Sequence, residues 1–343
     1  MEEEGVFSGR RQQNPTPQQN LDLQDELGAQ ETFGETERAV AEIGEKDGAK
    51  RPAGWAKKIF AGVGVSVLLL AAYLGMQLAA GVVFLVGLCV RIAQERGVDL
   101  NDAMIFAMRA VATDSEMMSL LTAVTVIAPA VPAAFFYWLL WGRKRTAADR
   151  AFFRERALRA RVFLMISVAA FGLYYLAVII TAAISTVSPN TMQEYEDMMD
   201  LALGGDTIII LAATVLAAPI GEECLMRGLI LRRLQKYFSV PAVIIIQAVL
   251  FGVFHMNWVQ GIYVLPVGAA LGYTAVKCRS VLPSIYMHMF YNLMSSVVAL
   301  LPPFFQSGIC CVLMPLLCAG LVWLLGKRGD VRKRLDAQGQ VRD

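Results

Sequence analysis

Three ionisable residues, Glu222, Glu223 and Arg227, lie within an apolar stretch of this 343-residue chain. Charges inside a membrane segment are costly, so such residues face a partner or a cavity and mark functional sites. Residues four apart share one face of a helix, which lets Glu223 and Arg227 form an ion pair. Glu222 is rotated by about 100° from Glu223 and has no partner on its own helix.

The only two histidines of the chain, His255 and His288, also lie in apolar runs. Asn292 follows His288 by four residues, so both can point from one helix into a single cavity, which His255 joins from its own helix. A lone membrane histidine is more often a hydrogen-bond partner between helices than a catalyst. A lone Glu–Arg pair can equally be a structural clamp. The joint occurrence of these residues favours a catalytic site.

These residue types suit hydrolysis by water. The unpaired carboxylate of Glu222 can act as general base for a bound water, while His288 and Asn292 can donate hydrogen bonds to the oxyanion that forms at an attacked carbonyl. Glu222, His255 and His288 also make a plausible three-ligand set for catalytic Zn²⁺ with an open fourth position. The residues leave both chemistries open, water activated by a carboxylate and water activated by a metal.

The residues just before the glutamates predict an irregular helix. Pro219 lacks an N–H and Gly221 loosens packing, so we expect a kink or local opening here, with a small aqueous pocket beside Glu222. Cys224 is expected to pack rather than to act as a nucleophile. The six cysteines show no paired spacing, which indicates buried apolar side chains rather than disulfides.

The elements that must position these residues are membrane helices. The chain is 56% hydrophobic and 17% charged, which predicts an all-α, polytopic transmembrane bundle. A span needs about 20 apolar residues, and eight segments qualify at roughly 59–90, 119–141, 162–186, 207–231, 240–258, 260–276, 281–301 and 306–326. The first is long enough to tilt or to extend beyond the bilayer, and an internal break near Gly75 to Gly81 is the alternative.

Charge placement predicts the topology. Lysines and arginines crowd alternate links, whereas the link after the third span is acidic, which places both termini in the cytoplasm. The basic residues do not gather on one face, and the net charge is +2, so no nucleic-acid partner is expected. The predicted parts are an acidic, disordered tail at 1–56, three spans at 57–205, a catalytic core at 206–301, and a last span with a basic tail at 302–343.

Three short motifs follow one another along the chain. They are Glu222-Glu223 with Arg227, Phe251 with His255, and His288 with Asn292. Their pattern, E-E-x-x-x-R, F-x-x-x-H and H-x-x-x-N, resembles the CAAX protease and bacteriocin-processing (CPBP) family of intramembrane endopeptidases. That family includes the Ras-converting CAAX endopeptidase and bacterial Abi-type proteins. The resemblance covers roughly 206–301.

The resemblance implies a role for each matched residue. Glu222 would activate water with help from His255, and His288 with Asn292 would stabilise the oxyanion. In a metal-dependent version, Glu222, His255 and His288 would bind zinc. Glu223 and Arg227 resemble the supporting ion pair. The expected protein is a multi-pass enzyme of a bacterial plasma membrane that cuts a peptide or protein substrate associated with the lipid bilayer.

Two other function classes compete with this prediction. A membrane scaffold or a bacteriocin-immunity protein could use the same fold without cleaving anything, and a transporter could line an ion path with the same polar residues. The lack of an evident inverted repeat counts against a transporter. Other protease signatures, H-E-x-x-H and G-x-S-x-G, are absent from the sequence.

Overall fold

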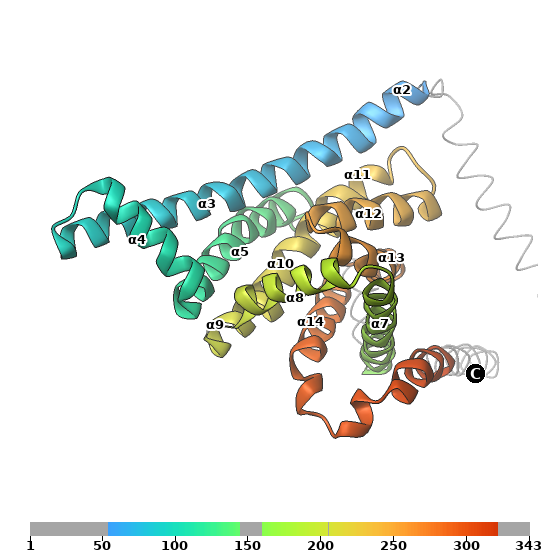
Figure 1. Cartoon of the computed structure of the whole chain (residues 1–343). Coiled ribbons are helices and arrows are strands. Elements are labelled where there is room, and N and C mark those ends of the chain that lie inside the picture. Colours follow the sequence, from blue (N-terminus) through green and yellow to red (C-terminus); the bar gives the residue numbers. More distant parts are fainter. Residues whose placement is uncertain (1–53, 145–159, 205, 322–343) are drawn as a thin grey trace, which may run out of the picture. The chain divides into compact units, whose positions relative to one another are not determined.

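The structure is a computed structural model that describes residues 54–144, 160–204 and 206–321. Contacts divide the chain into two units, Met1–Ala56 and Lys57–Asp343, and the second holds the elements that matter below. The predicted acidic tail and the basic C-terminal tail lie outside the described residues. All regular structure in the described ranges is helical (Figure 1), which confirms the predicted all-α class.

The first apolar run forms one continuous helix. The short α2 (Trp55–Lys58) and the π-helical η1 (Ile59–Gly64) lead into α3 (Val65–Arg96), so the alternative of a break near Gly75 to Gly81 is wrong. The helix ends at Gly97, whose positive φ of 64° suits glycine.

Two helices were not predicted from the sequence. The helix α4 (Leu100–Thr113) is capped by Asp99, and its small buried residues Ala103 and Ala107 pack against α3. The helix α8 (Pro189–Leu203) carries most of the acidic link. With 14 and 15 residues, both helices are shorter than a membrane span, and each carries charged residues, which kept them out of the predicted spans.

The remaining helical elements include the segment with the glutamates, α10, and the helices that pack near it. The elements are α5 (Ser115–Tyr137), η2 (Trp138–Gly142), α7 (Ala160–Val187), α9 (Thr207–Leu211), η4 (Ala212–Ala217), α10 (Ala218–Glu223), η5 (Cys224–Leu231), α11 (Arg232–Leu234), α12 (Val240–Phe254), α13 (Trp258–Cys278), α14 (Leu282–Val297), η6 (Val298–Leu300) and η7 (Pro303–Gln306), followed by the helix Gly308–Leu321. The segments from α9 to α11 form one rod, in which α10 packs against α5 and α14 (Figure 1).

The main core is built around this rod. Buried side chains of η5, α12, α13 and α14 meet there, for example Met226, Phe251, Leu271 and Met287. This core places the glutamates among apolar side chains from several helices.

Five helices are long and apolar enough to cross a membrane. They are Trp55–Arg96, Ser115–Gly142, Ala160–Val187, Thr207–Leu234 and Trp258–Cys278. The other three predicted spans are shorter helices, α12, α14 and Gly308–Leu321. The chain is therefore an all-α polytopic bundle, and the count of eight spans and the cytoplasmic termini stay predictions.

The predicted fifth span ends earlier than expected. We expected a helix over 240–258, but α12 stops at Phe254 and His255 is its C-terminal cap. Met256 adopts a left-handed conformation with φ of 53°, and Asn257 caps the next helix by accepting a hydrogen bond from the Gln260 N–H. This tight turn places His255 at a helix end rather than inside a span.

Candidate active site

Glu223 is the centre of a buried polar network. Its side chain is fully buried, and Arg227 Nη1 donates to its Oε1 at 2.7 Å. The same oxygen accepts a hydrogen bond from His288 Nδ1 at 3.0 Å, while the hydroxyl of Ser284 donates to the other oxygen. Glu223 therefore joins the rod to α14 as well as neutralising the arginine.

Arg227 is held on several sides. Its Nη2 donates to the Gly268 carbonyl at 3.0 Å, which also accepts from Gln247 Nε2 at 2.8 Å. The guanidinium carbon lies 4.7 Å from the centre of the Phe251 ring, a cation–π distance. Arg227 thereby connects the rod to α12 and α13.

His288 faces both glutamates through different ring nitrogens. A carboxylate accepts hydrogen bonds, so the contact with Glu223 places a hydrogen on His288 Nδ1. The other nitrogen, Nε2, lies 3.9 Å from Glu222 Oε2, which is longer than a direct hydrogen bond. Glu223 orients the ring so that Nε2 faces Glu222.

Glu222 differs from its neighbour in having little support. Its side chain is 14% exposed, whereas that of Glu223 is 0% exposed. Its buried Oε2 has no hydrogen-bond partner among the described residues. A carboxylate oxygen in this state is suited to accept a hydrogen bond from a water or a substrate.

His255 reaches the cluster through the aromatic side chain of Phe251. Its Nδ1 lies 2.8 Å from the Phe251 carbonyl, and because a carbonyl accepts, Nδ1 carries the hydrogen and Nε2 is an acceptor. The Phe251 ring packs edge-on against His255 at 4.8 Å and against His288 at 5.8 Å between ring centres. Phe251 is the shared wall between the two histidines.

Asn292 lies one turn beyond His288 on α14. Its Nδ2 donates to the Thr214 carbonyl at 2.8 Å, in the π-helical η4. Asn292 therefore ties α14 to the rod in this structure. Of the predicted residues, Glu222, Glu223, Arg227 and His288 meet directly, His255 joins through Phe251, and Asn292 lies one turn away.

Gly221 does not loosen the packing, contrary to expectation. A Cβ added there would lie 2.6 Å from both Ala130 Cβ and Tyr73 Oη, so the glycine permits helices to approach closely. The rod stays continuous, and its irregularity lies in the π-helical segments η4 and η5 on either side of α10. Single π turns are frequent at functional sites.

Two neighbours of the site were missed by reasoning from the sequence. Ser284 precedes His288 by four residues, so the helical spacing that paired His288 with Asn292 could have found it. Tyr73 of α3 is 2% exposed, packs against Phe254 with ring centres 5.5 Å apart, and lies with its hydroxyl against Gly221, the residue before Glu222. No local pattern connects it to the motifs, because it comes from the first helix.

The proposed zinc ligands do not form a ligand set in this arrangement. Within the described ranges, no group of three or more His, Cys, Asp or Glu side chains could hold a metal ion. Glu223 occupies His288 Nδ1, and the Phe251 carbonyl occupies His255 Nδ1. Zinc binding by Glu222, His255 and His288 stays a prediction.

Comparison with known proteins agrees with the motifs. Residues 204–294 match the family model described as type II CAAX prenyl endopeptidase Rce1-like. The matched range contains all three motifs, from Glu222 to Asn292. Searches of curated proteins and of solved structures found no match to the chain. Over residues 204–294, the chain is therefore similar to the Rce1-like family of type II CAAX prenyl endopeptidases.

Proposed function

We propose that this protein is an intramembrane endopeptidase that hydrolyses a peptide bond of a membrane-associated protein or peptide. The observation that carries the proposal is the pairing of Glu222 with His288. A buried carboxylate oxygen that has no hydrogen-bond partner among the described residues faces a histidine nitrogen, and a second carboxylate accepts from the other nitrogen of that ring. The family match of the same segment supports this reading.

In the proposed reaction, Glu222 is the general base. It accepts a proton from a water molecule as the water oxygen attacks the carbonyl carbon of the substrate. A C–O bond forms, and the π-electron pair of the carbonyl moves to its oxygen. When the tetrahedral intermediate collapses, the C–N bond breaks and Glu222 returns the proton to the leaving amine.

The other residues stabilise charge and orient the water. Protonated His288 donates from Nε2 to the oxyanion, and Glu223 stabilises the imidazolium through Nδ1. Asn292, one turn along, supplies a second hydrogen-bond donor, its side-chain amide, once substrate is bound. His255 Nε2 accepts a hydrogen bond from the attacking water.

Cleavage by purified protein tests the proposal. The wild type and the variants Glu222→Gln and His288→Ala are compared in detergent on a membrane-anchored fluorogenic peptide, with Glu95→Gln as a control for an exposed carboxylate. We expect Glu222→Gln to lower kcat by roughly 10²–10⁴-fold, the usual contribution of a general base. Equal cleavage by the wild type and both site variants would exclude these roles.

Metal dependence needs a separate measurement. The proposed steps use no metal, because the described residues contain no group of three His, Cys, Asp or Glu side chains that could hold a metal ion. We expect activity to persist after chelation and elemental analysis to find less than one zinc per chain. Stoichiometric zinc that is lost from both His255→Ala and Glu222→Gln would instead support the metal-activated mechanism.

A further inference from the structure

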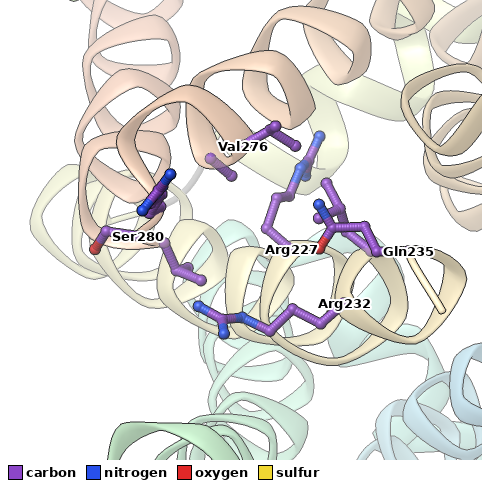
Figure 2. Close-up of a pocket in the computed structure, with 9 residues that line it drawn as sticks. Arg227, Arg232, Gln235, Val276 and Ser280 are labelled. Carbon is purple, nitrogen blue, oxygen red and sulfur yellow. The ribbon is translucent and has the colours of Figure 1, made fainter. Parts of the chain in front are cut away.

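A cavity of about 220 Å³ is lined by Arg227 but by neither Glu222 nor Glu223 (Figure 2). It is lined by residues of η5 and α11, by the end of α13, and by the residues that lead into α14. One water molecule takes up about 30 Å³ in the liquid. The cavity therefore has room for a tetrahedral anion with part of its hydration shell.

The lining is strongly basic. Among the nine residues that line the cavity are three arginines, Arg227, Arg232 and Arg279, with two neutral polar side chains, Gln235 and Ser280, and no acidic residue. The other four are apolar. Guanidinium groups bind phosphate through several N–H donors at once.

The three arginines are not equivalent. Arg227 is paired with Glu223, so its charge is compensated, although its Nε has no hydrogen-bond partner among the described residues. Arg232 has no ion-pair partner within the described ranges, and its guanidinium carbon lies 5.5 Å from the Trp141 ring. Figure 2 shows the Arg232 side chain extended along the cavity, with its guanidinium end directed toward the side where Ser280 lies. We regard Arg232 as the principal cation of this site.

The cavity lies where two candidate spans end. The spanning rod ends at Leu234 and α13 ends at Cys278, next to the cavity residues Gln235 and Arg279. Lipid phosphates lie just beyond the hydrocarbon core, at the level where spanning helices end. From the charge, the space and this position, we propose that the cavity binds a phosphate group, carried either by an anionic lipid or by a soluble compound.

A plainer role for the arginines exists. Basic residues are favoured at helix C-termini, where they interact with the last carbonyls and with the helix dipole. That role explains the position of Arg232 and the position of Arg279, each at its own helix end. It does not require that both line one cavity with Arg227, and it predicts no saturable binding of phosphate.

Equilibrium binding separates the two roles. The full chain in neutral detergent is titrated by calorimetry with dihexanoyl phosphatidylglycerol and, separately, with inorganic phosphate at constant ionic strength. Saturable binding of the lipid alone assigns the phosphate to a lipid, and binding of inorganic phosphate assigns it to a soluble source. Either result supports the site, whereas no binding of either probe overturns it.

Variants locate the binding. Arg232→Gln and Arg279→Gln each remove one charged donor, which corresponds to a loss of about tenfold or more in affinity. Lys236→Gln is the matched control, because Lys236 lies one turn after Arg232, also contacts Trp141 at 5.4 Å, and does not line the cavity. Undiminished binding by both arginine variants, or an equal loss with Lys236→Gln, would refute the proposal. Circular dichroism and gel filtration check that each variant is folded.

Discussion

The Glu223–Arg227 pair allows a quantitative test of the buried network. Both side chains are 0% exposed, and the pair is 2.7 Å long. Removing one partner of a buried ion pair leaves an uncompensated charge and costs about 3–5 kcal/mol. The perturbations are Glu223→Gln and Arg227→Met, singly and together.

The structure ranks the two single variants. After Arg227→Met, the carboxylate of Glu223 keeps the donors of His288 and Ser284. After Glu223→Gln, the guanidinium of Arg227 loses its carboxylate partner and keeps neutral acceptors, the Gly268 carbonyl and the amide oxygen of the new side chain. We therefore expect Glu223→Gln to lower the free energy of unfolding by about 4–5 kcal/mol and Arg227→Met by about 3 kcal/mol. The double variant should cost less than the sum, because both charges are removed.

The protein contains a control pair with the same spacing. Arg91 Nε and Glu95 Oε1 are also 2.7 Å apart and four residues apart, but their side chains are 71% and 59% exposed. Exposed pairs contribute little to stability, so Arg91→Met and Glu95→Gln should leave the unfolding midpoint unchanged.

The free energy of unfolding of all five variants can be measured by reversible unfolding in mixed micelles. The micelles are titrated with a denaturing detergent, and circular dichroism follows the loss of helix. If Glu223→Gln destabilised the protein no more than Glu95→Gln did, or if the double variant cost the full sum, the reasoning from burial would be wrong. If Glu223→Gln lowered activity without lowering stability, the role of Glu223 would be to orient His288 and not to stabilise the fold.

Three further predictions concern packing and access. Gly221→Ala should destabilise the protein by about 1–3 kcal/mol through overpacking, whereas Gly75→Ala, with open space around its Cβ, should be neutral or slightly stabilising in thermal melts. Ser284→Ala should lower kcat while the fold persists in circular dichroism, because Glu223 loses one of the groups that hold it in place; unchanged kcat would exclude a positioning role. Cys278, which is half-buried, should be alkylated before the four buried cysteines, as mass spectrometry of a maleimide time course would show.

Much of the fold could be predicted from the sequence because its signals are local. Long apolar runs specify membrane helices, and the four-residue spacing of Glu223 and Arg227 specifies their pair wherever the helix lies. The helices α4 and α8 escaped prediction, because they are shorter than a membrane span and carry charged residues.

The site itself depended on tertiary structure. Glu223 meets Ser284 and His288 across sequence separations of 61 and 65 residues, and no spacing rule spans such distances. Only the packing of α10 against α14 brings them together. The same packing gives the two adjacent glutamates different surroundings. Glu223 accepts from Arg227, Ser284 and His288, while Oε2 of Glu222 has no hydrogen-bond partner in the part of the chain that the structure describes. The sequence by itself predicted the candidate residues and the pairing of Glu223 with Arg227. The folded bundle added Ser284 and His288 as further partners of Glu223, because these residues come from a helix that only tertiary packing brings close.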